Sequence, residues 1–207
     1  MKRRGRHLGT LMSKRTATIE RKTSETDVSV HVGLDGTGRA KIETGVPFLD
    51  HMLTLFAKHG ILDLEVSCKG DLGVDAHHSV EDIGICLGSA LDKALGNKSG
   101  LTRFAHSYFP MDETLVRVVV DLSGRPNLIY RVKAERERVG ELDSDLIEEF
   151  WKAVVTHARM TMHLELLYGR NMHHIFEAMF KAAARALCLA TRPDPRVQGV
   201  PSTKGVL

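Results

Sequence analysis

Hydrophobic residues recur every three or four positions in four segments of the chain. Residues 47–60, PFLDHMLTLFAKHG, place their large apolar side chains on one face, begin at a proline and end at a glycine, as amphipathic helices commonly do. Residues 77–96, 144–159 and 173–190 have the same spacing of apolar positions. The pattern therefore predicts four helices.

Segments with a period of two lie between these helices. Residues 28–45, VSVHVGLDGTGRAKIETG, carry alternating apolar residues on both sides of a glycine-containing turn and predict a β-hairpin. Residues 113–122 and 127–135 predict a second strand pair, with SGRP turning between them. Single strands are predicted at 61–70 and 160–169.

The order of these elements recurs along the chain. Each half contains paired strands, a helix, a strand and a second helix, with a boundary near residues 98–102. We therefore expect an α+β fold of internally duplicated α/β half-domains. Each is expected to be a mostly antiparallel four-stranded sheet with two helices on one face, one strand more than this pattern locates. The half-domains are placed at 16–100 and 101–192, between a basic tail at 1–15 and a C-terminal tail at 193–207.

Composition and charge narrow the class of protein. A chain of 207 residues, 43% hydrophobic and 27% charged, is long enough to bury a sizeable core. No apolar run reaches the roughly 20 residues that cross a bilayer. The first 15 residues carry six of the 29 basic residues and no acid, which is typical of an unstructured extension. Three widely spaced cysteines predict no disulfide framework and a reducing compartment, the cytoplasm.

The sequence HHxxE occurs twice, each time at the start of a predicted helix. The two copies consist of His77, His78 and Glu81, and of His173, His174 and Glu177. Residues four apart lie on the same face of a helix, so the first histidine and the glutamate of each copy can point at one site. The second histidine is rotated by one residue, so each motif can contribute to two metal sites.

The residue types of the motif indicate its chemistry. Imidazole nitrogens combined with carboxylates suit Mn, Fe, Co or Zn better than Ca or Mg. No cysteine lies near these histidines in the sequence, which argues against a closed structural zinc site. One HHxxE copy alone is more often a capping or surface feature. Two copies at matching places favour an open, catalytic metal site.

The register of the repeat identifies further candidates. His51 precedes His77 by 26 residues and Glu149 precedes His173 by 24. Glu149 is therefore the counterpart of His51, with loops absorbing the difference. Basic and small polar residues at loops, strand ends and one helix face can together bind a phosphate; these are Arg103, Arg125, Lys181, Ser202, Thr203 and Lys204.

Six separated motifs resemble one enzyme family. The segments ETGVPFLDHML, DAHHSVEDIG, PMDETL, DLSGRPN, GRNMHHIFEAMFKA and GVPSTKGVL closely resemble imidazoleglycerol-phosphate dehydratase, and the similarity covers about residues 16–207. The resemblance implies the elimination of water from imidazole glycerol phosphate to give imidazole acetol phosphate in histidine biosynthesis. It also implies two manganese ions (Mn²⁺) per active site and a homo-24-mer built from trimers, with metal sites shared between neighbours.

The family's site residues map onto matching positions of this chain. The implied metal ligands are His51, His77, His78, Glu81, His173, His174 and Glu177, with Glu149 where some relatives have histidine. The implied substrate contacts are Glu25, His51, His59, Arg103, Arg125, Lys181, Ser202, Thr203 and Lys204. By analogy, Glu25 is the first candidate for moving protons, whereas Glu81 and Glu177 are ligands first and catalytic candidates second. At Glu149, either the carboxylate or a water can take the ligand position.

Two other functions fit parts of the sequence. A dimetal carboxylate oxidase or hydrolase would carry similar ligands, but such helical bundles have no strands between their metal helices. A nucleic-acid binder recruited through the basic tail would show salt-dependent binding that deletion of residues 1–15 abolishes. Beyond that tail, 23 basic residues face 26 acidic ones, and this mildly acidic body argues against nucleic acid.

Overall fold

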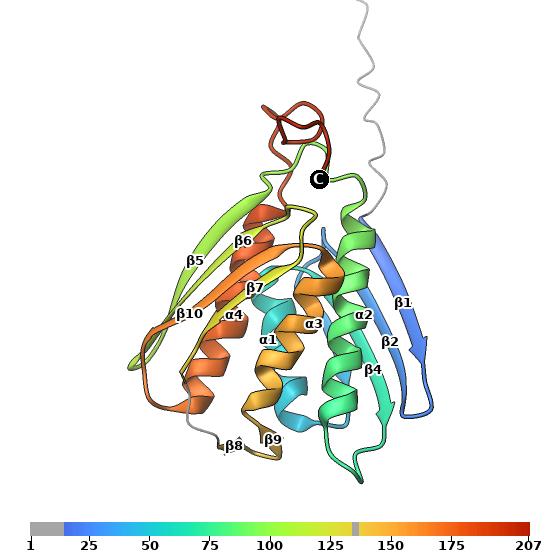
Figure 1. Ribbon diagram of the computed structural model, residues 1–207, viewed down its shortest axis with the longest axis vertical. Coiled ribbons are helices and arrows are strands. Elements are labelled where there is room, and N and C mark those ends of the chain that lie inside the picture. Colours follow the sequence, from blue (N-terminus) through green and yellow to red (C-terminus); the bar gives the residue numbers. More distant parts are fainter. Residues whose placement is uncertain (1–14, 134–136) are drawn as a thin grey trace, which may run out of the picture.

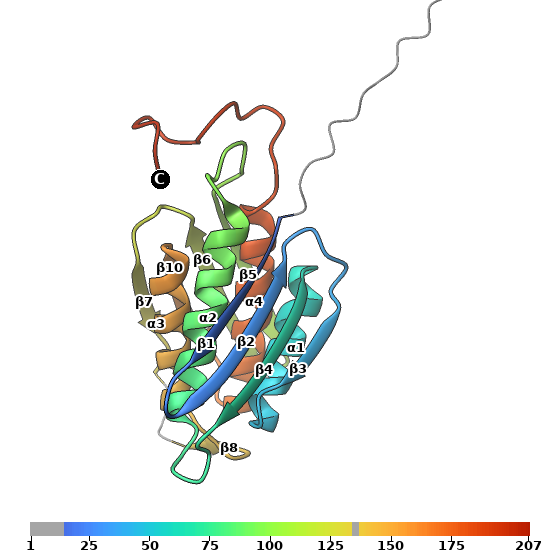
Figure 2. The same cartoon turned by 90° about the vertical axis from the view of Figure 1, so that its right-hand side faces the viewer.

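The computed structural model describes residues 15–133 and 137–207. These residues form two four-stranded sheets with four helices packed between them (Figure 1 and Figure 2). The basic tail predicted at 1–15 falls, except for Arg15, outside the described residues. Among the residues that are described, no helix is long and apolar enough to cross a membrane.

The first half of the chain forms one sheet and two helices. Its elements are β1 Thr16–Lys22, β2 Thr26–Gly33, β3 Ala40–Glu43, α1 Pro47–Gly60, β4 Asp63–Gly70 and α2 His77–Leu95. The strands lie in the order β1-β2-β4-β3. Strand β3 runs parallel to β4, and the other neighbours are antiparallel. Helix α1 makes the crossover that a parallel pair requires.

The second half repeats this arrangement. Its elements are β5 Phe104–Met111, β6 Thr114–Asp121, β7 Asn127–Arg131, α3 Asp145–Ala158, β10 Thr161–Tyr168 and α4 Met172–Ala190, with the short hairpin β8 Arg138–Val139 and β9 Leu142–Asp143 before α3. The strand order is β5-β6-β10-β7, with β7 parallel to β10. The predicted α+β fold with an internal duplication is therefore confirmed.

The predicted strand pairs are wrong in both halves. Residues 28–45 do not form a hairpin, because β4 lies between β2 and β3. Likewise β10 lies between β6 and β7, so the described part of the strand predicted at 127–135 does not pair with 113–122; residues 134 and 135 lie outside the described residues. Each crossover helix returns the chain into the gap between two strands that are neighbours in sequence. The sequence pattern locates neither β1 nor β5. Both strands consist mainly of exposed or half-buried residues, so their apolar period is weak.

Contacts between the helices bring the two HHxxE motifs close to residues of the other half. Helix α2 packs against α3, and α1 packs against α4. The approach of α2 to α3 depends on glycine, because a Cβ atom at Gly88 would lie 2.4 Å from the carbonyl oxygen of Val154. Trp151, Phe56 and Phe180 fill the centre of the helical layer and are fully buried.

Candidate active site

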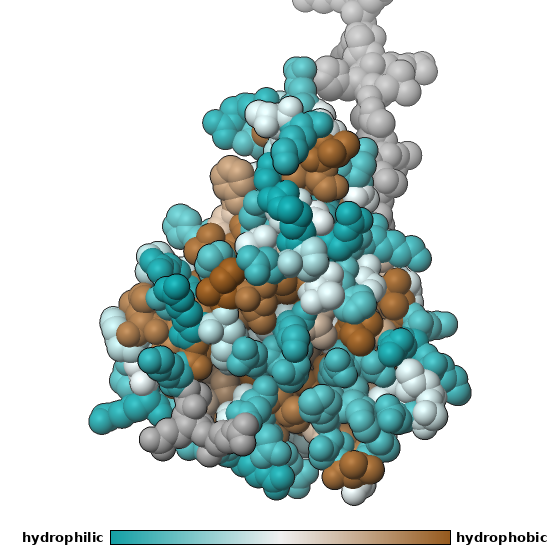
Figure 3. Space-filling view, viewed as in Figure 1, coloured by the Kyte–Doolittle hydropathy of each residue, from teal (hydrophilic) through white to brown (hydrophobic). Residues whose placement is uncertain are grey.

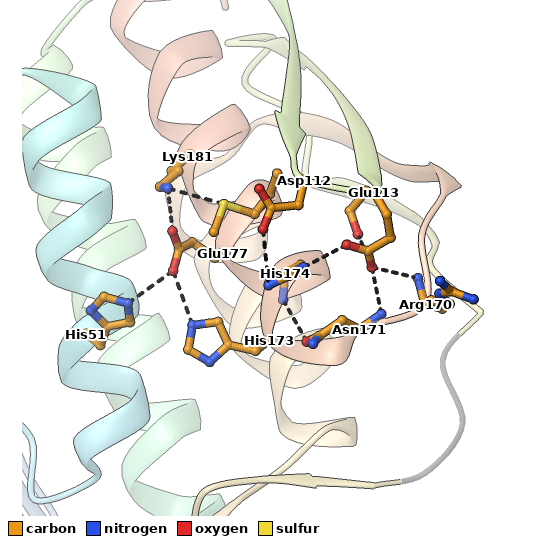
Figure 4. Close-up of polar contacts among 11 residues, drawn as sticks. His51, Asp112, Glu113, Arg170, Asn171, His173, His174, Glu177 and Lys181 are labelled. Carbon is orange, nitrogen blue, oxygen red and sulfur yellow. Dashed lines mark hydrogen bonds and ion pairs between the residues drawn. The ribbon is translucent and has the colours of Figure 1, made fainter.

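A compact group of possible metal ligands lies where α1 meets α4. His51 comes from α1, whereas His173 and Glu177 lie one turn apart on α4. Glu177 Oε2 is 3.1 Å from His51 Nε2 and 3.2 Å from His173 Nε2 (Figure 4). One ligand atom from each residue lies within 4.8 Å of the other two. Two imidazoles and a carboxylate at this spacing can hold a divalent transition metal.

The surroundings of Glu177 keep its carboxylate charged. Burial of this residue, whose side chain is 9% exposed, opposes ionisation. Hydrogen bonds from Lys181, His51 and His173 outweigh burial and lower the pKa of Glu177 to about 2. Lys181, one turn further along α4, donates to Glu177 Oε1 and lies 5.5 Å from the ring centre of Phe109. A charged carboxylate is therefore present at neutral pH.

The first HHxxE motif faces the equivalent helix of the other half. His77 at the start of α2 and Glu149 on α3 line one hollow, next to the β8–β9 hairpin. Glu149 is the fifth residue of α3, as His51 is of α1. Its carboxylate lies 3.4 Å from Lys152 Nζ, and Glu81 is exposed. Within the described residues, this end forms no three-ligand cluster as tight as that around Glu177.

The second histidine of each motif contacts carboxylates outside this cluster. His78 Nδ1 lies 3.0 Å from Asp71 Oδ2, and its Nε2 lies 3.8 Å from Glu25 Oε1. His174 Nδ1 lies 2.7 Å from Glu113 Oε2. The hydrogen bonds to Asp71 and Glu113 raise the pKa of the two rings.

Asp71 and Glu113 were not among the residues selected from the sequence. A signal for Glu113 exists, because SETD at 24–27 and DETL at 112–115 both lead into the second strand of their sheet. Glu25 and Glu113 each stand immediately before that strand. They are therefore counterparts in the two halves, and the comparison of halves that pairs His51 with Glu149 would have paired them too.

His59 lies two turns beyond His51 on the same helix. Its ring centre is 5.6 Å from that of Phe109. Burial lowers the pKa of the His59 ring, and the nearby charges of Lys181 and Arg185 lower it further. The neutral form of the ring is therefore favoured.

The predicted phosphate ligands, apart from Lys181, gather at one hollow. It is lined by Arg103, Arg125, Pro201, Ser202, Thr203 and Lys204. Asp121 holds the Arg103 guanidinium through bonds of 2.8 and 3.2 Å, and Arg103 also donates to the Pro201 carbonyl oxygen at 2.7 Å. Gly124, with φ +71°, allows the close approach of Leu207, since a Cβ there would lie 2.4 Å from the Leu207 carbonyl carbon. These contacts seat the C-terminal segment beside the two arginines.

The phosphate hollow and the Glu177 cluster lie at opposite ends of α4. The Arg103 amide donates to the carbonyl oxygen of Ala190, the last residue of α4, whereas His173 stands in the first turn. At 1.5 Å per residue these two positions are about 26 Å apart. Figure 1 shows the same separation, with the C-terminal segment at the top and the start of α4 near the bottom.

Comparisons with known proteins agree on one family. The family model for imidazoleglycerol-phosphate dehydratase matches residues 44–187. The proteins of that name from Thioalkalivibrio sulfidiphilus and Acetivibrio thermocellus are 55% and 54% identical; the alignments cover 95% and 91% of this chain and 100% and 97% of theirs.

Solved structures give the same result. The imidazoleglycerol-phosphate dehydratase of Staphylococcus aureus is 42% identical with a TM-score of 0.79, over 86% of this chain and 99% of that one. The Pyrococcus furiosus structure, a complex with (S)-C348, is 40% identical with a TM-score of 0.79, over 91% of this chain and 100% of that one. The chain belongs to the imidazoleglycerol-phosphate dehydratase family.

Proposed function

We propose that this chain removes water from imidazole glycerol phosphate to give imidazole acetol phosphate, a step of histidine biosynthesis, in the cytoplasm. Its membership of the dehydratase family supports the reaction. The observation that carries the proposal is the cluster of His51, His173 and Glu177, whose ligand atoms lie within 4.8 Å of one another. Apolar packing alone does not require two imidazoles and a carboxylate at this spacing, whereas a metal-dependent enzyme requires such ligands.

The donor set fits Mn²⁺, and we propose two ions per active site. Nitrogen and carboxylate donors together suit such an ion, and the low pKa of Glu177 supplies the charge. The ligands of one site include His51, His173 and Glu177, and those of the other include His77, Glu81 and Glu149; His78 and His174 complete the set. When bound, the metal supplies a Lewis acid and a template for the imidazole of the substrate.

Glu25 is the proposed residue for moving protons at the reacting carbons and the leaving oxygen. Its side chain is half exposed, and its carboxylate lies 3.8 Å from His78 Nε2. A carboxylate held this loosely can turn between substrate atoms. Its counterpart Glu113, by contrast, is fixed by the backbone amides of Arg170 and Asn171. The duplication therefore leaves one of the two glutamates free to act as general acid and base.

The phosphate group of the substrate is proposed to bind in the hollow lined by the C-terminal segment. Two guanidinium groups and one ammonium group converge there, from Arg103, Arg125 and Lys204. The Lys204 amide donates to Ser202 Oγ at 3.2 Å, which keeps the loop compact. Charge-assisted hydrogen bonds from such groups favour a phosphate dianion.

The length of α4 supports an active site assembled from different copies of the chain. A small phosphate ester cannot span the roughly 26 Å between His173 and the Ala190 end of α4, beside which Arg103 lies. The metal end of one copy must therefore meet the phosphate hollow of another, as expected for the proposed homo-24-mer built from trimers. Leu72 and Val74 in the β4–α2 loop are 40% and 73% exposed, and Figure 3 shows an apolar tip at that end. These side chains favour contact with a neighbouring copy.

A turnover assay tests this function. The purified protein is stripped of metal, Mn²⁺ is added back, imidazole glycerol phosphate is supplied, and the ketone product is followed together with the oligomer size. We expect manganese-dependent product and growth from small oligomers to a shell. Full metal loading and correct assembly without product would contradict the proposed activity.

A further inference from the structure

The carboxylate of Glu113 is held on both sides in the turn between β5 and β6. Its Oε1 accepts the amides of Asn171 at 3.0 Å and Arg170 at 3.3 Å, together with the Thr114 hydroxyl at 3.1 Å. Its Oε2 lies 2.7 Å from His174 Nδ1 (Figure 4). Glu113 therefore joins the β5–β6 turn to the start of α4 and contacts one specific nitrogen of the His174 ring.

The other half contains the same contact made by a different residue. His78 Nδ1 lies 3.0 Å from Asp71 Oδ2, and Asp71 follows strand β4. Glu25, the counterpart of Glu113, instead lies on the Nε2 side of His78. A carboxylate thus occupies the Nδ1 side of the second histidine in both motifs, although Asp71 and Glu113 come from non-equivalent loops. On the Nε2 side, the carboxylates of Glu25 at His78 and of Asp112 at His174 lie at 3.8 and 3.7 Å, beyond hydrogen-bonding distance. Hydrogen bonds from two non-equivalent loops therefore converge on Nδ1, which indicates a requirement of the histidine.

We infer that Glu113 is a positioning residue that accepts a hydrogen bond from the Nδ1–H group of His174 and so leaves the lone pair of the ring on Nε2. This inference rests on the proposed function, in which His174 is a metal ligand. A neutral imidazole carries its proton on one nitrogen and ligates through the other. A carboxylate on the second nitrogen fixes the ring's orientation and its tautomer and raises its basicity. Asp71 has the same relation to His78.

The Glu113→Gln variant separates this role from a purely structural one. Two backbone amides and a hydroxyl point at Oε1, so the glutamine carbonyl oxygen takes that position and the loop stays anchored. The NH₂ group then faces His174 Nδ1 at the former Oε2 position. It donates there, so Nδ1 must act as the acceptor and the ring proton moves to Nε2, the nitrogen required for the metal.

Two measurements follow on metal-stripped, full-length protein. Magic-angle-spinning NMR of ¹⁵N-histidine-labelled protein in alkaline buffer, assigned with a His174→Gln variant, reports the tautomer of His174. Titration with Mn²⁺, followed by electron paramagnetic resonance of the free ion, reports affinity. We expect an Nδ1–H ring in the wild type and an Nε2–H ring in Glu113→Gln, with Mn²⁺ affinity about 10- to 100-fold weaker. Asp27→Asn, which removes an exposed carboxylate paired with Lys22, is the matched control. It should leave the His174 tautomer and the Mn²⁺ affinity unchanged.

The outcomes distinguish the inference from the proposed function. An unchanged His174 tautomer in Glu113→Gln, or an Mn²⁺ affinity within about twofold of the wild type, would overturn the positioning role while leaving the metal site intact. Weakened Mn²⁺ binding without a tautomer change would indicate that Glu113 only anchors the loop, and would overturn the inference too. Failure of the wild type itself to bind Mn²⁺ would overturn the metal assignment on which the inference rests.

Discussion

Replacing Glu177 with glutamine should destabilise the metal-free protein by removing a buried charge. The pKa of Glu177 falls from 4.5 to about 2 through hydrogen bonds that outweigh its burial. A difference of one in pKa corresponds to about 1.4 kcal/mol, so the charged carboxylate contributes about 3 kcal/mol at neutral pH. The Glu177 side chain is 9% exposed and that of Lys181 is 11% exposed, so solvent screens the interaction between them only weakly. The variant also leaves Lys181 without its anionic partner.

Urea denaturation in the presence of a chelator, at one protein concentration, measures this difference. The folded pKa of Glu177, about 2, lies below its unfolded value of 4.5. The stabilisation is therefore complete above that unfolded pKa and is lost as the pH falls toward the folded pKa. The wild type should be about 3 kcal/mol more stable than Glu177→Gln at neutral pH, and the difference should shrink on acidification. A difference below about 1 kcal/mol, or one independent of pH, would refute the assigned role of the cluster.

Three further predictions address other parts of the account. Glu25→Gln should lower turnover by about 10² to 10⁴ with metal content unchanged, and near-normal turnover would exclude it as the proton carrier. Gly88→Ala should lower the free energy of unfolding by about 1–3 kcal/mol, because its Cβ would lie 2.4 Å from the Val154 oxygen; a variant that unfolds like the wild type would contradict this. Glu149→Ala should lower Mn²⁺ content whereas Glu149→His retains it, and equal content, assembly and activity in the alanine variant would remove this residue from the ligands.

The sequence predicted helices well and strand partners poorly. The predicted helix at 47–60 matches α1, because an N-terminal proline, a C-terminal glycine and a strong apolar period define it. The helices predicted at 77–96 and 173–190 differ from α2 and α4 by one residue at an end. Strand pairing failed because it depends on where the crossover helix returns the chain, which the alternation of apolar residues does not encode.

Some residues of the candidate site could likewise be predicted from the sequence, and others could not. His51 and Glu149 could be selected because the duplication fixes their positions relative to the two HHxxE motifs, and they occupy equivalent positions on α1 and α3. Comparison of the two halves could have selected Glu113 as the counterpart of Glu25. Asp71 could not be selected in this way, because it makes its contact from the β4–α2 loop whereas Glu113 makes its contact from the β5–β6 turn. The sequence also gives no sign of the separation between Arg103 and His173. In the structure, Arg103 lies beside the last residue of α4, whereas His173 lies in its first turn.

Subunit complementation tests most directly the claim that one active site joins the metal end of one copy to the phosphate hollow of another. His173→Ala and Arg125→Gln proteins, carrying different tags, are assayed alone and after co-expression and purification of mixed oligomers of confirmed size. The account predicts that each variant alone is inactive and that mixed oligomers turn over imidazole glycerol phosphate, because some sites combine an intact metal end with an intact hollow. Mixed oligomers as inactive as the separate variants would contradict it.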